Sequence, residues 1–347
     1  MAGDRQHILP RFLLKGFASR IHGKEIYTWV YLRKGAIFEA NINKIGIEKH
    51  FYGRKGEFRV DAEITDFEGE YAPLLDELRD SQGQVEIYNQ RIANLITHFV
   101  TRTKHLRDSY IESVEYLSEK IEEYFSDPEN TKAAIFSQPE IMRASIEKGF
   151  KDFPVLQPYK DFLYPLLPYL LNAFLETHKT EIQKIRQDFF KDIRNNILPK
   201  ATVEGHIKGL SQGLIPEPRV QDYLLLRWFV INCRNPLILG DIGCLFETKG
   251  TRRFKPINSH DDEIINIFLP ISDKQILIGT SLSNPPQINL NLINTAIAKC
   301  SREFFICSEQ NKEIASLISL LGKEAEMMSK EEIENIVNKI IIKLRVK

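Results

Sequence analysis

Residues 84–125 carry the longest regular hydrophobic pattern in the chain and read QVEIYNQRIANLITHFVTRTKHLRDSYIESVEYLSEKIEEYF. Apolar side chains recur there in steps of three, four or seven, the spacing that places them on one face of an α-helix. Ser81 and Gln84, at the start of this pattern, have the form of a capping box. We therefore predict one long helix over roughly residues 84–125, buried along a single seam.

Helices are also predicted on both sides of this segment. Residues 61–79 repeat apolar side chains at helical spacing, and residues 131–150 and 159–197 continue the helical pattern. Several prolines near the start of 159–197 predict an irregular beginning. A Ser-x-x-Glu capping box opens a further amphipathic helix, predicted over residues 329–346.

Strand-forming sequence lies towards both ends of the chain. Glu25–Leu32 and Ala36–Ala40 are separated by a short turn and predict a β-hairpin. Later apolar runs between turn signals predict a helix over 289–300 and strands at 224–233, 237–239, 264–269, 275–280 and 303–307. Unpaired strands at either end would leave open sheet edges. We therefore predict an α+β fold in which long helices pack on one mainly antiparallel sheet formed by the N- and C-terminal segments, in a single domain over residues 1–347.

Composition narrows the class of protein. The chain has 347 residues, of which 43% are hydrophobic, enough for a large core. Because 47 basic residues balance 47 acidic ones, a basic face for nucleic acid would have to be offset by acid elsewhere. The four cysteines show no zinc spacing, and no window is long and apolar enough for a membrane span or signal peptide. These features predict a soluble, cytoplasmic protein without a membrane anchor.

His7 and His206 are the histidines with the clearest local context, and the two differ in what they indicate. His7 stands three residues before Pro10, which is well suited to the first position of a helix. A neutral imidazole there can act as a general base or a metal ligand, or it can bond nearby backbone and fix the path of the chain. His206 is predicted to lie in a polar loop and to face solvent.

Arg102 stands in the apolar seam of the long predicted helix. A buried guanidinium is costly unless it is paired, so we expect a carboxylate partner, with Glu68 and Asp241 favoured. The pair is either a structural ion pair or a clamp for an anionic substrate group. His98 and His105 share the stripe of Arg102 and are predicted to be surface residues.

Asp241 follows the predicted strand 237–239, and functional carboxylates often lie in loops at strand ends. Together with Glu247 and Lys249 it suggests the carboxylate pattern of metal-dependent nucleases. A two-residue turn after Asp241 would, however, pair Glu247 with Ile238, about 10 Å from Asp241 along the strand and on the opposite face. Two ligands of one metal cannot be so placed, and this geometry argues against a nuclease site.

Several of these residues match the signature of one family, in order, over roughly residues 6–310. The matching segments are Gln6-His7-x-x-Pro10-x-Phe12-x-Leu14-x-x-Phe17, Phe51-Tyr52, Glu68, Arg102-Thr103, Arg107, Ile267-Phe268-Leu269-Pro270-Ile271-Ser272, and Leu292 to Asn294 with Ser301 to Cys307. In this pattern the chain resembles the microbial domain-of-unknown-function 4238 family. That family tends to carry Ser-Asp-x-Pro around Asp241, where this chain has Gly240 and Gly243. The resemblance implies no settled activity, but it implies that His7, Arg102 and Asp241 share a polar site.

Two functions remain open. In the first, the protein is a hydrolase for a phosphoester or nucleic-acid substrate. His7 would be general base or acid, Arg102 would hold an anionic group next to Glu68, and Asp241 would orient His7 or bind a divalent metal. In the second, the protein is a non-catalytic interaction or regulatory protein. These residues are then structural, and helix 329–346 docks a protein partner or a second copy of the chain.

Overall fold

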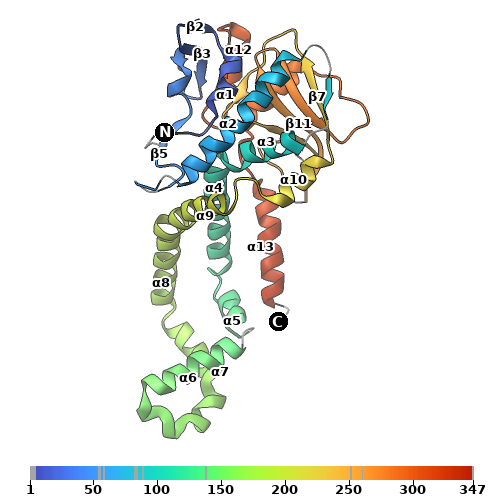
Figure 1. The fold of residues 1–347 in the computed structure, drawn as a ribbon. Coiled ribbons are helices and arrows are strands. Elements are labelled where there is room, and N and C mark those ends of the chain that lie inside the picture. The colour runs from blue at the N-terminus through green and yellow to red at the C-terminus, as the bar shows by residue number, and fades with distance from the viewer. Residues whose placement is uncertain are drawn as a thin grey trace. The chain divides into compact units, whose positions relative to one another are not determined.

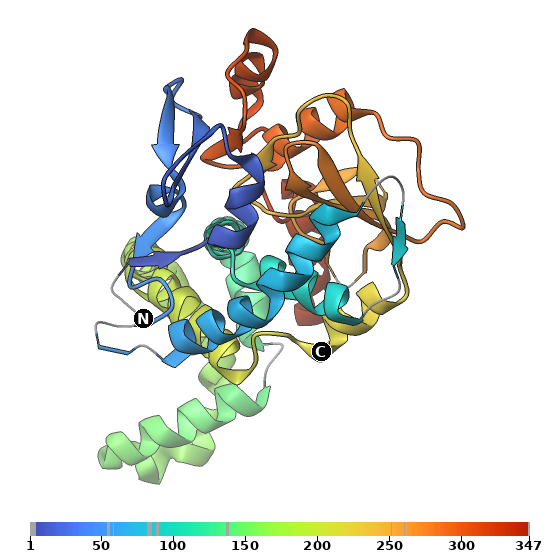
Figure 2. The ribbon, with the colours of Figure 1, turned by 45° about the horizontal axis from the view of Figure 1, so that its top comes forward.

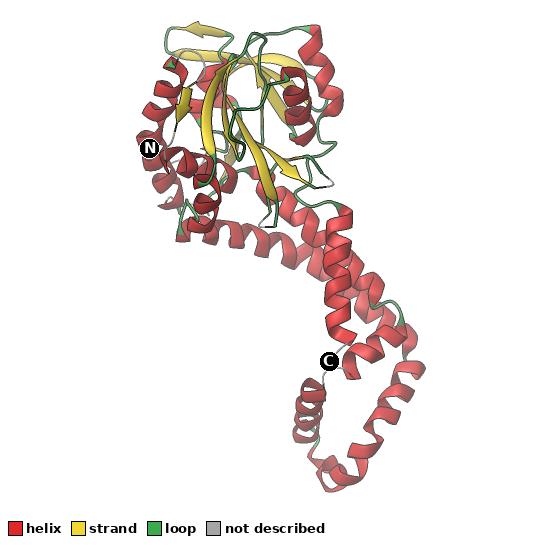
Figure 3. Cartoon of the chain, turned by 90° about the vertical axis from the view of Figure 1, so that its right-hand side faces the viewer, coloured by secondary structure: helices red, strands yellow, loops and turns green. Residues whose placement is uncertain are grey.

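The computed structural model describes residues 5–53, 56–57, 59–81, 85–87, 90–136, 139–250, 252–259 and 261–345. The chain forms two compact units, here called unit 1 (residues 1–110 and 202–327) and unit 2 (residues 111–201 and 328–347). The described strands, yellow in Figure 3, belong to unit 1, whereas the described elements of unit 2 are helices joined by short turns. The single domain predicted over residues 1–347 stays a prediction.

Unit 1 contains three sheets in which every described strand pair is antiparallel. The largest runs in the order β10 (Phe254–Lys255), β9 (Leu245–Lys249), β11 (Glu263–Ser272), β12 (Gln275–Thr280), β7 (Arg227–Asn232) and β6 (Val85–Ile87). The second contains β2 (Arg20–His22), β3 (Glu25–Leu32), β13 (Phe304–Cys307), β8 (Leu239–Gly240) and β4 (Ile37–Asn41), which pairs with β3. The smallest joins β1 (Arg5–His7) to β5 (Ile47–Lys49).

The second sheet brings distant parts of the chain together. β13 lies against β3 with Cys307 opposite Trp29, so the blue N-terminal hairpin stands beside late, orange-red segments in Figures 1 and 2. This is the sheet shared by both ends that the sequence predicts, and the α+β class with antiparallel sheets is confirmed. The strands are nevertheless divided among three sheets rather than one. β7, β9, β11 and β12 pair with one another instead of with the N-terminal hairpin.

Helices of unit 1 cover these sheets. They are α1 (Arg11–Leu14), α2 (Arg59–Asp80), α3 (Gln90–Thr101), the start of α4 (Lys104–Tyr124), most of α9 (Leu198–Gln212), α10 (Glu217–Leu224), α11 (Leu290–Cys300) and α12 (Lys312–Ser316), with short 3-10 turns η1 (Lys15–Phe17), η2 (Ile42–Lys44) and η5 (Leu317–Leu320). Apolar stripes of α2 and α3 meet the large sheet in one core, in which Leu75, Ile96, Trp228 and Leu277 are almost wholly inaccessible.

Unit 2 consists of the rest of α4, α5 (Pro128–Phe136), α6 (Pro139–Asp152), η3 (Pro154–Tyr159), α7 (Lys160–Thr177), α8 (Lys179–Asp192), the π-turn η4 (Ile193–Ile197), the start of α9, and α13 (Lys330–Arg345). The capping box predicted for α13 is confirmed: the Ser329 N–H donates to Glu332 Oε2 at 2.6 Å, and the Glu332 N–H donates to Ser329 Oγ at 3.1 Å. α13 packs on α5 and buries Ile333 and Val337.

The long helix predicted over residues 84–125 is wrong in its continuity. Residues 85–87 form strand β6, and the helical part divides into α3 and α4 at Arg102 and Thr103. Thr103 Oγ1 accepts a hydrogen bond from the Leu106 N–H at 3.2 Å, so it caps a new helix rather than continuing the old one. The capping box predicted at Ser81 and Gln84 involves Gln84, which lies outside the described residues.

Candidate functional site

Arg102 lies at the end of α3, almost wholly buried, and its guanidinium connects separate segments of unit 1. Nε donates to Tyr52 Oη at 3.1 Å, Nη1 donates to Glu68 and lies 3.0 Å from His98 Nε2, and Nη2 donates to the carbonyl of His7. The expected carboxylate partner is therefore Glu68. All but one of the N–H donors of Arg102 are used within the fold, which leaves little capacity to clamp a substrate.

His98 and His7 are shaped by this arginine. Burial, reinforced by the Arg102 charge, holds the pKa of His98 well below its ordinary value. Burial together with Arg11 and Arg102 lowers the pKa of His7 to about 4. Both imidazoles are therefore neutral at neutral pH. The prediction that His98 is a surface residue is wrong, because the Phe67 ring packs against its ring at a tilt and the side chain is inaccessible.

A second buried arginine lies one turn into α4. Arg107 Nη2 donates to the Phe51 carbonyl at 2.6 Å and lies 2.8 Å from His206 Nδ1. Because Nδ1 accepts from Arg107, Nε2 carries the proton of His206 and donates to the Thr101 carbonyl at 2.9 Å. The prediction that His206 faces solvent in a loop is wrong, since it lies in α9 and joins that helix to α3 and α4.

Asp241 has a structural role that the sequence did not show. Its carboxylate accepts hydrogen bonds from the backbone N–H groups of Arg302 at 2.9 Å, Glu303 at 2.6 Å and Phe304 at 3.4 Å. Burial raises the pKa of Asp241 to about 6, although these hydrogen bonds oppose the shift. The structure brings His7, Arg102 and Glu68 together through hydrogen bonds of the guanidinium. Among the described contacts, none joins Asp241 to His7 or Arg102, and its carboxylate instead binds the backbone of residues 302–304.

The two glycines that depart from the family pattern have local reasons. A Cβ on Gly240 would lie 1.9 Å from Ser301 Oγ, so no side chain fits there. Gly243 adopts a φ of 71°, which proline cannot reach. The pairing expected between Glu247 and Ile238 is wrong, because Glu247 lies opposite Phe254 and Asn266 in the large sheet.

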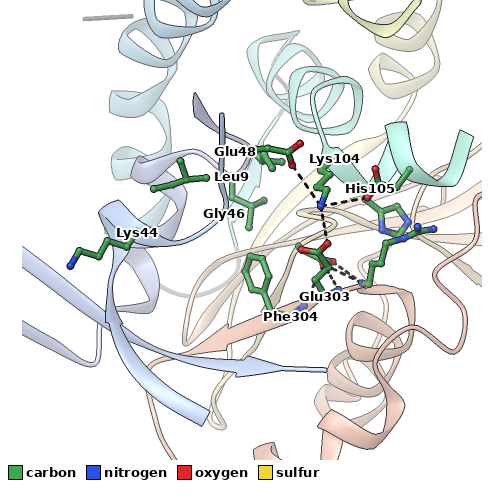
Figure 4. Close-up of a pocket in the computed structure, with 13 residues that line it drawn as sticks. Leu9, Lys44, Gly46, Glu48, Lys104, His105, Glu303 and Phe304 are labelled. Atoms are coloured by element: carbon green, nitrogen blue, oxygen red, sulfur yellow. Dashed lines mark hydrogen bonds and ion pairs between the residues drawn. The ribbon is translucent and has the colours of Figure 1, made fainter. Parts of the chain in front are cut away.

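A polar pocket of about 170 Å³ opens beside Asp241. Its walls come from residues 8–9, 44–48, 104–108 and 302–304 together with Asp241. Figure 4 shows these side chains, with the Lys104 amine at the centre of the charged groups. The pocket lies entirely within unit 1.

Lys104 is surrounded by carboxylates. Its Nζ lies 2.8 Å from Glu303, 3.6 Å from Glu48 and 3.8 Å from Asp108, as the dashed lines in Figure 4 trace. Although partial burial by itself disfavours the charged amine, these carboxylates raise the pKa of Lys104. Lys104 therefore remains an ammonium ion throughout the physiological range.

His105 lines the same pocket and is inaccessible, so the prediction that it is a surface residue is wrong. Neither of its ring nitrogens makes a well-aligned hydrogen bond with a described residue, although the Ala325 carbonyl lies close enough to favour the charged form. Burial lowers its pKa to about 3, helped by Arg302 and opposed by the nearby Ala325 carbonyl. Because both ring nitrogens are inaccessible, His105 contributes to the wall of the pocket as a neutral ring.

The pocket has an excess of acid. Four carboxylates line it (Glu48, Asp108, Asp241 and Glu303) against three cations (Lys44, Lys104 and Arg302). The Lys44 side chain extends away from the Lys104 cluster in Figure 4, so its charge offsets the carboxylates around Lys104 less than the other two cations do. The site therefore favours a ligand that brings positive charge.

Sequence reasoning singled out Asp241 but missed most of this pocket. The one available signal was the four-residue spacing of Lys104 and Asp108, which suits an ion pair on a helix. Glu48, Arg302 and Glu303 come from remote segments and carry no local pattern. Among the described residues, no three His, Cys, Asp or Glu side chains are grouped so that they could hold a metal ion, and the divalent metal stays a prediction.

The fold and site define an α+β protein with antiparallel sheets, a buried arginine network and a small acidic pocket. The chain belongs to the family described as protein of unknown function (DUF4238), whose model matches residues 5–343. The family resemblance seen in the sequence is thereby confirmed. No curated protein and no solved structure matches the chain.

Proposed function

We propose that the chain is a non-catalytic binding protein that takes a small, amine-bearing polar molecule into the Lys104 pocket. The observation that carries the proposal is the acidic lining of the pocket, in which carboxylates outnumber cations and Glu48, Asp108 and Glu303 all lie within 4 Å of the Lys104 amine. A ligand ammonium group would complement the carboxylates that surround Lys104.

The size of the pocket supports a small ligand. Sites for drug-sized molecules usually enclose about 300–1,000 Å³, and this pocket encloses about 170 Å³. The binding proposal also agrees with the use of Arg102 and Glu68 inside the fold, where they are occupied with each other. The location we propose is the cytoplasm, in keeping with four cysteines that are all free thiols.

Titration calorimetry on the full chain tests this proposal. The probes are putrescine, free amino acids, inorganic phosphate and adenosine monophosphate. We expect one amine to bind per chain, and Glu48→Gln to weaken that binding about tenfold, equivalent to about 1.4 kcal/mol. The matched control Glu313→Gln alters an exposed carboxylate of α12 and should leave binding unchanged. Absence of amine binding, or tighter binding of the phosphates, would refute the proposal.

The second candidate is a hydrolase for a phosphoester or nucleic-acid substrate, using His7, Arg102 and Asp241. One observation favours it: the pKa of Asp241 is raised to about 6, near the range that suits a general acid or base. The acidic pocket and the occupied Arg102 count against it. Assays of p-nitrophenyl phosphate and single-stranded DNA and RNA, with and without Mg²⁺, test this candidate. A turnover that falls at least tenfold in both His7→Ala and Asp241→Asn would support it, and turnover that persists in both would rule it out.

A further inference from the structure

Helix α7 is apolar on two sides, but only one of them is covered. Leu163, Leu167, Leu171 and Leu175 are half-buried against the rest of unit 2. A separate stripe at helical spacing is exposed, and it consists of Phe162, Leu166, Tyr169, Leu170 and Phe174. A helix that is apolar nearly all round is normally buried, so this stripe lacks a partner in the single chain.

The exposed area is large enough for a stable interface. η3, directly before α7, and the residue that precedes it add the exposed side chains Phe153, Val155, Leu156 and Tyr159. The aromatic side chains of this region are 53% to 76% exposed, and they are Phe153, Tyr159, Phe162, Tyr169 and Phe174. If a fully exposed aromatic side chain has an area of about 200 Å², these five together present about 600 Å² to solvent. The four aliphatic side chains add to this. A standard protein–protein interface buries about 800 Å² on each partner, which this surface can supply.

The charge pattern of α7 argues against a membrane as the surface that covers the exposed stripe. Helices that lie on membranes carry several basic residues on their polar face. The only basic residue of α7 is Lys160, whose amine is paired with Glu147 at 2.8 Å. In the described part of the chain, no helix combines the length and apolar character needed to cross a bilayer.

The stripe is symmetric about position 168, which favours a second copy of the same chain. Phe162 and Phe174 lie six residues on either side of this position, and Leu166 and Leu170 lie two residues on either side. These four residues follow one another in steps of four and form a single ridge along the helix. If two copies pack antiparallel, Phe162 meets Phe174 of the second copy and Leu166 meets Leu170, so the same contacts occur twice. That is the arrangement of a two-fold symmetric dimer.

We propose that the exposed stripe of α7 is a homodimer interface, formed by antiparallel packing of two copies about the level of residue 168. The interface lies in unit 2 and is separate from the Lys104 pocket of unit 1, so its failure would leave the binding proposal intact. The sequence suggested α13 as the self-association surface, but Ile333 and Val337 of its apolar stripe are already buried within the unit.

Sedimentation velocity of the full chain tests the interface. We expect the wild type to sediment at twice the monomer mass and Leu170→Glu to be a monomer, because the introduced charge would be buried at the centre of the interface. The matched control Leu225→Glu makes the same change at a leucine of unit 1 that is 84% exposed, and it should remain a dimer. Circular dichroism of each variant verifies that the fold is kept.

Charge pairing tests the antiparallel arrangement itself. Leu166→Glu and Leu170→Lys should each give monomers, whereas the double variant should dimerise again because each introduced carboxylate faces an introduced amine. A monomeric wild type would overturn the proposal. It would equally be overturned by dimerisation that survives L170E but is lost in Ile342→Glu on α13, or by wild-type protein that co-sediments with phosphatidylcholine–phosphatidylglycerol vesicles.

Discussion

Arg102 is a single side chain that joins four segments of unit 1. It contacts His7 in β1, Tyr52 in the loop after β5, Glu68 in α2 and His98 in α3. Burial by itself disfavours the charge, but Tyr52 and Glu68 raise the pKa of Arg102 above its ordinary value. The arginine is therefore a charged structural residue whose loss would leave buried polar groups without partners.

Replacing this arginine should destabilise the protein strongly. We expect Arg102→Met to lower the free energy of unfolding by about 3–5 kcal/mol, the usual cost of breaking a buried pair from one side. Urea unfolding followed by circular dichroism measures this change. Arg59→Met is the matched control, because Arg59 is 79% exposed and pairs with Glu63 only at the surface. It should change the free energy by no more than about 0.5 kcal/mol. An equal effect of the two substitutions would contradict the structural role of Arg102.

At the scale of elements, the break between α3 and α4 decides where the functional residues go. On one continuous helix, His98, Arg102 and His105 would lie along the same stripe. Because α4 begins anew after Thr103, His98 stays with Arg102 while His105 enters the pocket beside Asp241. The hydrogen bond from the Leu106 N–H to Thr103 Oγ1 stabilises this second helix start.

The cap can be tested without altering the core. We expect Thr103→Ala to lower the free energy of unfolding by about 1 kcal/mol, the typical value of a helix N-cap. Thr103→Ser keeps the hydroxyl group and should retain most of the stability. Thermal unfolding of the two variants side by side measures the difference. If serine proved as damaging as alanine, the hydroxyl group would not be the stabilising element.

For the molecule as a whole, buried neutral histidines make stability depend on pH. Burial lowers the pKa of His105 to about 3 and that of His206 to about 4. The unfolded chain therefore binds more protons than the folded one below pH 6.5, and stability falls as the pH drops from there towards 4. Asp241 has the opposite effect on stability. Because its pKa is raised, the folded state takes up a proton before the unfolded state does, and this favours the folded state as the pH falls through 6.

The histidines outnumber this carboxyl, so we expect the free energy of unfolding to decrease between pH 6.5 and 4. Each unit by which folding lowers the pKa of a histidine reduces the free energy of unfolding by about 1.4 kcal/mol once the pH lies below the pKa values of both states. His105→Gln should make the decrease shallower, whereas His22→Gln, at an exposed position of β2, should not. Urea midpoints measured at half-unit pH intervals give the slopes. Identical slopes for wild type and His105→Gln would show that His105 does not contribute.

Local pattern in the sequence determined the elements whose formation depends on near neighbours. The β3–β4 hairpin, helix α2 and the capping box of α13 all agree with prediction, because turn residues, apolar periodicity and caps act within a few residues. Only the tertiary structure decided the division into three sheets, the choice of Glu68 for Arg102 and the pocket around Lys104. These contacts join segments from 34 to 199 residues apart. A periodic stripe shows that a side chain is buried but not which remote segment covers it.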